Sequence, residues 1–242
     1  MAKPAKTDRQ AVIDSIRKQQ KGAEKRRGLM IVGVCIVIAV LIVGAAAFQP
    51  VKNWWELRGF NELGVAEIGA AADVCQKVDT KPANGSQDHV QPGTPIPIEH
   101  APPAFGTHYD VWDGIERKLY TADDRPDVGE LLHNLEHGYT ILWYDKTIAD
   151  DEDQMQLLRG IAQKFTDNDN LRSKFKAVPW TEADGEAFPD GQHIAFTHWS
   201  VGDGEEGGQQ GVWQYCSETS GAALEDFMIE YPYTDSPEPN AI

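Results

Sequence analysis

The sequence predicts an α+β protein that consists of one N-terminal transmembrane helix and one small exported domain, with a mainly antiparallel sheet and flanking helices. Three observations lead to this fold class. Residues 29–48 contain no charged side chain over twenty consecutive positions. About 190 residues follow this segment, which is enough for one domain with its own core. Beyond residue 138, apolar runs typical of strands alternate with segments of helical periodicity, an order typical of α+β domains.

The apolar segment 29–48 predicts a membrane-spanning helix. At about 1.5 Å per residue, a helix of this length covers the roughly 30 Å hydrocarbon core of a bilayer. Residues 1–28 carry nine Lys or Arg and three acids, a net charge of +6. By the positive-inside rule, this basic tail stays in the cytoplasm and the rest of the chain is exported. We therefore expect a single-pass protein of the cell membrane that contacts the lipid bilayer through residues 29–48.

A cleaved signal peptide is the alternative interpretation of the N-terminus. Ala45, Ala46 and Ala47 resemble a small-residue cleavage site. The apolar run is longer than the roughly 7–15 residues of a signal-peptide core, and the basic region before it is long. These two features favour an uncleaved signal-anchor.

Two parts are expected after the membrane helix: a membrane-proximal connector over residues 49–74 and the exported domain over residues 75–239. Trp54 and Trp55 fit the outer membrane interface, where indole rings find both polar and apolar contacts. Small and apolar residues alternate over residues 61–78 and predict a short helix.

The exported domain begins with a stretch rich in proline and glycine, residues 80–107, and continues with periodic elements. Residues 139–145 predict a buried strand. Residues 151–166 predict an amphipathic helix that begins with acidic residues. The remaining expectations are strands at 173–180 and 191–200, a flexible connection over Gly202–Gly211 and a final helix at 220–230.

Two cysteines in the exported part, Cys75 and Cys216, predict a disulfide. An oxidising compartment favours this bond, which closes a loop of about 140 residues and contributes about 2–4 kcal/mol. Two unrelated thiols are the alternative. Cys35 lies inside the apolar segment, where a thiol serves as a small apolar side chain.

The charge balance excludes one class of partner. The chain after residue 28 carries 13 Lys or Arg and 35 acids, a net charge of −22. A domain of this charge repels phosphate backbones and anionic lipid surfaces. We therefore expect no nucleic-acid partner.

The histidines are unevenly distributed, since five of the seven lie between residues 89 and 137. His133 and His137 are four positions apart and fall on one face of a helical turn. His89 and His108 lie in the loop region upstream. Because imidazole is a common ligand for zinc and copper, we predict one transition-metal site. Its predicted ligands are His89, His108, His133 and His137.

Three neighbours are predicted to support these ligands. Asn134 and Glu136 can accept a ring N–H and so determine a tautomer, and Tyr109 follows His108 directly. A ligand set without thiolate favours copper(II) or zinc over copper(I). In the alternative explanation, the histidines are buried and satisfied by backbone carbonyls. His193 and His198 flank a predicted strand and are expected to be structural or at the surface.

Four phrases of the chain resemble a known family. They are Asp88-His89-Val90, Pro102-Pro103-x-x-Gly106-x-His108-Tyr109, Leu132-His133-Asn134-Leu135-Glu136-His137-Gly138 and Phe227…Tyr231…Ser236-Pro237-Glu238-Pro239. Over about residues 75–239, the chain is similar to an actinobacterial family of membrane-anchored exported proteins, the domain-of-unknown-function family number 3105. The resemblance implies anchoring and export with an unassigned function. Ala104 and Phe105 stand where the family commonly has Ser and Gly, and His100 and His198 match no motif position.

Metal binding or handling without catalysis is the function that these observations favour. Two alternatives stay open. One is a non-catalytic accessory subunit of a membrane protein complex, with structural histidines. The other is a metal-dependent enzyme, either an oxidoreductase or a zinc hydrolase that uses His133-x-x-Glu136-His137. The hydrolase pattern belongs inside a long helix, whereas Gly138 ends the helical turn here.

Overall fold

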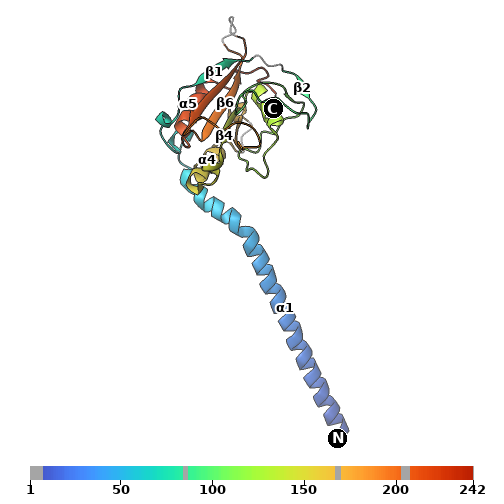
Figure 1. The fold of residues 1–242 in the computed structure, drawn as a ribbon. Coiled ribbons are helices and arrows are strands. Elements are labelled where there is room, and N and C mark those ends of the chain that lie inside the picture. The colour runs from blue at the N-terminus through green and yellow to red at the C-terminus, as the bar shows by residue number, and fades with distance from the viewer. Residues whose placement is uncertain (1–7, 84–86, 167–169, 203–207, 242) are drawn as a thin grey trace. The chain divides into compact units, whose positions relative to one another are not determined.

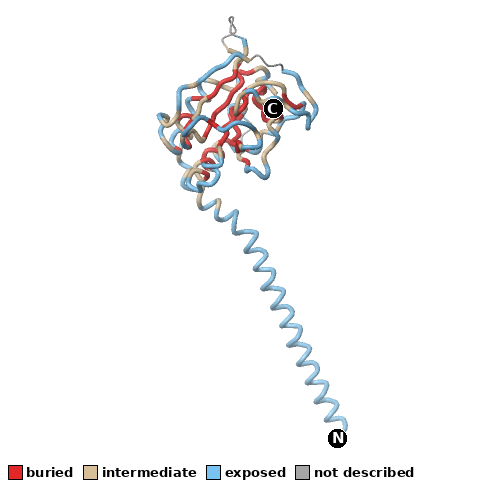
Figure 2. The backbone as a smooth tube through the Cα atoms, viewed as in Figure 1, coloured by how far each residue is buried: buried red, intermediate tan, exposed pale blue. Residues whose placement is uncertain are grey.

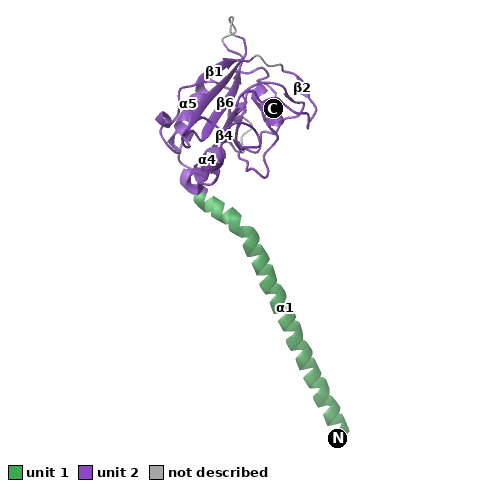
Figure 3. Cartoon of the chain, in the orientation of Figure 1, with its two compact units in different colours: residues 1–56 green, residues 57–242 purple. Residues whose placement is uncertain are grey.

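The computed structural model of the protein describes residues 8–83, 87–166, 170–202 and 208–241. The chain divides into two compact units, residues 1–56 and residues 57–242, which Figure 3 shows in different colours. The first unit is helical, and the second is an α+β domain with a mainly antiparallel sheet. The predicted fold class is confirmed.

The helix of the first unit is α1 (Asp8–Leu57), which runs without interruption through residues 29–48. Its apolar side chains in this stretch are exposed, as Figure 2 shows by the pale blue tube. The helix reaches a mean hydropathy of 3.1 over its most apolar window, which makes it long and apolar enough to cross a membrane. A membrane anchor and a signal sequence share these properties.

The sheet of the second unit has five strands in the spatial order β1-β7-β6-β4-β5 (Figure 1). The strands are β1 (Asp79–Pro82), β4 (Thr140–Tyr144), β5 (Phe175–Pro179), β6 (Ile194–Ser200) and β7 (Gln210–Cys216). Neighbouring strands are antiparallel except for the parallel pair of β4 and β5. A parallel pair needs a long crossover, which α3 (Lys146–Ala149) and α4 (Glu152–Phe165) supply.

Alternation along β4 divides the core into two layers. Leu142 and Tyr144 pack in the layer that contains α4 and α5 (Gly221–Glu230). Ile141 and Trp143 pack in the layer that contains α2 (Val128–Glu136). Both faces of the sheet are therefore covered, and Figure 2 shows the central strands in the red of buried residues. Helix α2, which carries the histidine motif, rests on one of these faces.

The predicted strands at 139–145, 173–180 and 191–200 correspond to β4, β5 and β6, but β7 was not expected. It begins at Gln210, inside the predicted flexible connection Gly202–Gly211, and continues beyond it to Cys216; residues 203–207 lie outside the described residues. The strand forms because it pairs with β6 along its whole length, from Ile194↔Cys216 to Ser200↔Gln210. A partner strand, rather than local propensity, decides its structure.

The single helix expected over residues 61–78 is wrong. The structure has two short 3-10 helices there, η2 (Val65–Glu67) and η3 (Ala72–Val74), after η1 (Arg58–Phe60). Between them, Gly69 has a φ of +88°, and a Cβ at this position would lie 2.3 Å from the Thr219 carbonyl oxygen. The next backbone N–H, that of Ala70, donates to the same oxygen at 2.9 Å. This contact with a distant segment replaces the helical hydrogen bonds.

Cys75 and Cys216 form a disulfide that ties the start of the domain to the end of β7. The two residues are 141 positions apart in sequence. A cross-link over so long a loop stabilises the fold mainly because it restricts the unfolded chain, by about 2–4 kcal/mol.

Candidate metal centre

Helix α2 brings the histidine motif to the site. Leu131, Leu132 and Leu135 are almost fully buried and hold the helix on the sheet. The helix stops at Glu136 because Gly138 follows with a φ of +88°, a conformation that only glycine adopts without strain. The C-terminal end of α2 is further held by the Lys174 ammonium group, which donates to the His137 carbonyl oxygen at 2.6 Å.

A small parallel pair of strands brings the other two histidines together. In β2 (His89–Val90) and β3 (His108–Tyr109), His89 is the register partner of His108. Two backbone hydrogen bonds hold the pair, from the His108 N–H to the Asp88 carbonyl at 3.2 Å and from the Asp110 N–H to the Val90 carbonyl at 3.0 Å. The two imidazole rings therefore lie side by side, with 4.4 Å between their centroids.

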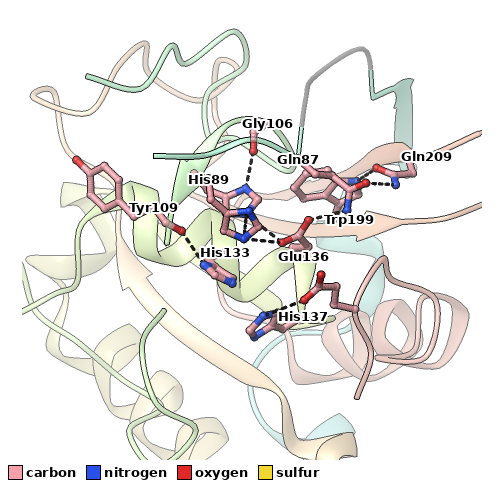
Figure 4. Close-up of polar contacts among 11 residues, drawn as sticks. Gln87, His89, Gly106, Tyr109, His133, Glu136, His137, Trp199 and Gln209 are labelled. Atoms are coloured by element: carbon pink, nitrogen blue, oxygen red, sulfur yellow. Dashed lines mark hydrogen bonds and ion pairs between the residues drawn. The ribbon is translucent and has the colours of Figure 1, made fainter. Parts of the chain in front are cut away.

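Three imidazoles and one carboxylate converge beside the last turn of α2 (Figure 4). One ligand atom from each residue lies within 4.8 Å of the others. The group consists of His89, His108, His133 and Glu136. His108 Nε2 lies 3.2 Å from His89 Nε2 and 2.9 Å from Glu136 Oε2. For comparison, bonds of about 2.0–2.1 Å to a tetrahedral zinc ion separate the ligand atoms by about 3.3 Å.

Backbone carbonyls determine the tautomers of two of these histidines. His108 Nδ1 lies 2.8 Å from the Gly106 carbonyl oxygen, and His133 Nδ1 lies 2.7 Å from the Tyr109 carbonyl oxygen. A carbonyl oxygen only accepts, so each Nδ1 carries the proton and donates it. In the neutral ring, Nε2 then presents a lone pair, which is the form that binds a metal.

Glu136 Oε2 lies against the Nε2 atoms of His108 and His89, at 2.9 and 3.5 Å. The side chain is fully buried, and Oε2 has no hydrogen-bond donor among the described residues. When His108 is neutral, its Nε2 and Glu136 Oε2 are two acceptors at a separation of 2.9 Å, and the nearest ring nitrogen to this Nε2 is His89 Nε2 at 3.2 Å. A buried carboxylate oxygen without a compensating partner is costly, and a shared cation satisfies both atoms. The donor set therefore fits a transition-metal ion.

The electrostatics of the site favour its metal-binding protonation states. Burial lowers the pKa of His133, so its ring is neutral at pH 7. Burial alone raises the pKa of Glu136, but the contacts with His108 and Gln87 lower it by more, so the net pKa lies below the ordinary value. A neutral imidazole and an ionised carboxylate are the ligand forms of both groups.

His137, a predicted ligand, lies next to this group but is not part of it. Its ring packs against those of His133 and Trp112, with centroids 4.4 and 4.9 Å away. Its Nε2 lies 3.6 Å from the Glu238 carboxylate, and burial lowers its pKa to about 4. Glu136, which the sequence suggested as a supporting residue, is a member of the group in its place. Its spacing of three from His133, on the same helix face, was the available signal.

The other two predicted supporting residues form hydrogen bonds that involve main-chain groups. The Tyr109 carbonyl orients His133, as described above. The Asn134 side chain holds the loop at Asp113: its Nδ2 donates to the Asp113 carbonyl at 2.8 Å, and its Oδ1 accepts from the Asp113 N–H at 3.2 Å. Asn134 therefore positions the chain that passes over the helix.

The remaining histidines lie elsewhere. His100 packs edge-on against the Trp213 ring at 5.3 Å. His193 Nδ1 contacts the Asp145 carboxylate at 2.8 Å. His198 is buried between two carbonyl oxygens, those of Tyr139 and Asp235. None of the three belongs to the His–Glu group within the described part of the chain.

Comparison with known proteins identifies one family. The sequence profile described as "Protein of unknown function (DUF3105)" matches residues 89–242, which include all four members of the His–Glu group. No curated protein and no solved structure matches the chain.

Proposed function

This chain belongs to the family described as "Protein of unknown function (DUF3105)", and we propose that its domain binds one transition-metal ion. The proposed ligands are His89, His108, His133 and Glu136. One observation carries the proposal: the buried Glu136 Oε2 has no hydrogen-bond partner among the described residues, and it lies 2.9 Å from His108 Nε2. A metal cation bound between these two atoms would satisfy the buried carboxylate oxygen.

The donor set narrows the choice of metal. Three imidazoles and one carboxylate suit zinc or copper(II), whereas copper(I) prefers thiolate or thioether ligands. The two cysteines of the domain are joined in a disulfide and are not available as thiolates. In this proposal, His137 supports His133 through ring contact, and the Tyr109 carbonyl sets its tautomer.

The geometry gives less support to a zinc hydrolase. In the HxxEH pattern, both histidines bind the metal and the glutamate acts as a base. Here Glu136 supplies an atom of the candidate ligand group, and His137 stands outside it. We therefore propose metal binding or handling as the function and assign no reaction.

The proposed location is the outer side of a cell membrane. The basic residues before the apolar stretch 29–48 favour a cytoplasmic N-terminus, and the disulfide is typical of an oxidising compartment. In this arrangement α1 is an uncleaved anchor, and the metal domain faces outward.

Metal analysis of the purified full-length protein tests the proposal. After exposure to zinc or copper(II) and removal of loosely bound ions, we expect about one equivalent per chain. His108→Ala and His133→Ala should each lose it. His100→Ala and His193→Ala are matched controls, because both residues lie outside the group, and they should keep it. Wild-type protein that retains no metal, or loss that is equal in the controls, contradicts the proposal.

A further inference from the structure

A chain of three hydrogen bonds leads from the core of the domain to the candidate metal centre (Figure 4). The Trp199 indole N–H donates to Gln209 Oε1 at 2.9 Å. Gln209 Nε2 donates to Gln87 Oε1 at 2.9 Å, and Gln87 Nε2 donates to Glu136 Oε1 at 2.6 Å. We refer to Trp199, Gln209 and Gln87 as the relay.

The direction of the relay is determined by its first member. An indole N–H only donates, so Gln209 must present its oxygen to Trp199 and its amide N–H group to Gln87. The same logic orients Gln87, whose amide N–H group then faces the carboxylate. Each of the two glutamines can therefore adopt only one amide orientation, and the relay ends as a donor to Glu136.

The relay is anchored in rigid structure. Trp199 belongs to β6 in the centre of the sheet and is fully buried. Its ring packs edge-on against that of His108, with 5.9 Å between centroids. Gln87 reaches the carboxylate from the segment just before β2, and β2 itself carries His89. The relay thus connects the sheet, a ligand-bearing segment and the helix that carries Glu136.

The relay leaves Glu136 with one oxygen for a metal. Oε1 accepts the short hydrogen bond from Gln87, whereas Oε2 lies 2.9 Å from His108 Nε2 and 3.5 Å from His89 Nε2. A carboxylate held in this way binds through a single oxygen. Three imidazole nitrogens and one oxygen make four ligands, the number that zinc prefers. Ions such as manganese favour more oxygen ligands.

We propose that Gln87, aligned by Gln209 and Trp199, holds Glu136 to single-oxygen ligation and so makes the site selective for four-coordinate ions such as zinc. Gln87 is a positioning residue that acts through Glu136. This inference rests on the proposed metal-binding function and adds to it the class of ion that the site selects.

Cobalt(II) in place of zinc reports the coordination number, because its visible d–d absorption is intense with four ligands and weak with five or six. The test uses the full-length protein with Gln87→Leu and Gln209→Leu. Gln91→Leu is the matched control, since Gln91 is an exposed residue of the same segment and bonds to Asp110 instead. The melting temperature of each metal-free variant monitors folding.

We expect wild-type protein and Gln91→Leu to give the intense cobalt spectrum. Gln87→Leu should weaken zinc binding about 10- to 100-fold, as is usual when a partner of a metal ligand is lost. It should also weaken the cobalt absorption several-fold and raise the affinity for manganese relative to zinc. Gln209→Leu should change the spectrum in the same direction, and it provides the test if Gln87→Leu does not fold.

The outcomes separate the two proposals. If wild-type protein binds zinc but Gln87→Leu and Gln209→Leu keep its affinity and cobalt spectrum, the relay inference is wrong and the metal-binding function stands. If wild-type protein binds neither zinc nor cobalt, the metal-binding function is wrong, and the relay inference falls with it.

Discussion

Replacement of Glu136 by glutamine should have opposite effects on the metal-free and the metal-bound protein. In the metal-free protein, the fully buried Oε2 faces the His108 Nε2 lone pair at 2.9 Å. Glutamine places an N–H group at this position, which can donate to that lone pair, while its oxygen still accepts from Gln87. The substitution removes a buried charge and an unsatisfied acceptor without a change in side-chain volume.

The expected size of the effect follows from the burial of this atom. An unsatisfied buried polar group costs about 1–3 kcal/mol, and part of this cost is recovered by the new N–H···N hydrogen bond. We expect metal-free Glu136→Gln to be more stable than wild type by about 1–2 kcal/mol. For a domain of this size, the melting temperature rises by about 2–4 °C per kcal/mol.

Zinc should reverse the order of stability. A ligand present at about 100 times its Kd stabilises the native state by about 2.7 kcal/mol, and a neutral carboxamide is a poor ligand for the ion. Wild-type protein should therefore gain several degrees on addition of zinc, and Glu136→Gln should gain much less.

Thermal melting of the full-length protein with a chelator and with zinc measures both effects. Glu225→Gln, an exposed substitution on α5, is the matched control and should follow wild type under both conditions. A metal-free Glu136→Gln protein that melts below wild type, together with an unchanged response to zinc, would refute the reasoning.

Three further predictions concern the rest of the domain. Cys75→Ser removes the disulfide with Cys216 and should lower the free energy of unfolding by about 2–5 kcal/mol in urea titrations; an effect of the same size in reduced wild-type protein is the control, and an unchanged midpoint argues against the bond. Gly138→Ala should lower the free energy of unfolding by about 1–3 kcal/mol or more, because φ is +88° and a Cβ would lie 2.3 Å from the Tyr233 carbonyl oxygen. Gly191→Ala, also at positive φ but in open space, measures the backbone strain without the clash, and an equal loss of stability in both variants would disprove the contact. Zinc affinity should fall as the pH drops below about 6.5, because imidazoles must lose their protons to bind a metal. The lowered pKa of His133 shifts the protonation of that residue to more acidic pH. A competition assay with a chelator between about pH 5 and 8 measures the zinc affinity, and a flat profile contradicts histidine ligation.

Local patterns in the sequence predicted most of the regular elements. The amphipathic period of residues 151–166 became α4, and the apolar runs became β4, β5 and β6. These predictions succeed because each pattern reflects burial. A helix with one buried face has apolar residues at a period of about 3.6, and a strand buried on both faces has a continuous apolar run. The missed strand β7 contains the β-branched and aromatic residues that are typical of strands, but it follows a glycine-rich, acidic segment. Its extended conformation depends on its pairing with β6.

The candidate site was predicted in part for a similar reason. His89, His108 and His133 were recognised from residue type and clustering, and all three lie in the group. The fourth member of the group is Glu136, whereas the sequence prediction named His137. Residues three and four positions after His133 lie near the same helix face, so spacing alone does not separate them. The position of β3 beside α2 decides which of the two meets the other histidines.

By itself, the sequence determined the long apolar helix, the main strands and helices and the histidine-rich region, because each depends on residues close together in the chain. Only the tertiary structure decided how the histidines are used. The parallel register places His89 beside His108, backbone carbonyls set the tautomers, and the relay from Trp199 turns one oxygen of Glu136 toward the imidazoles. These contacts join segments up to 122 residues apart, and no local period encodes them.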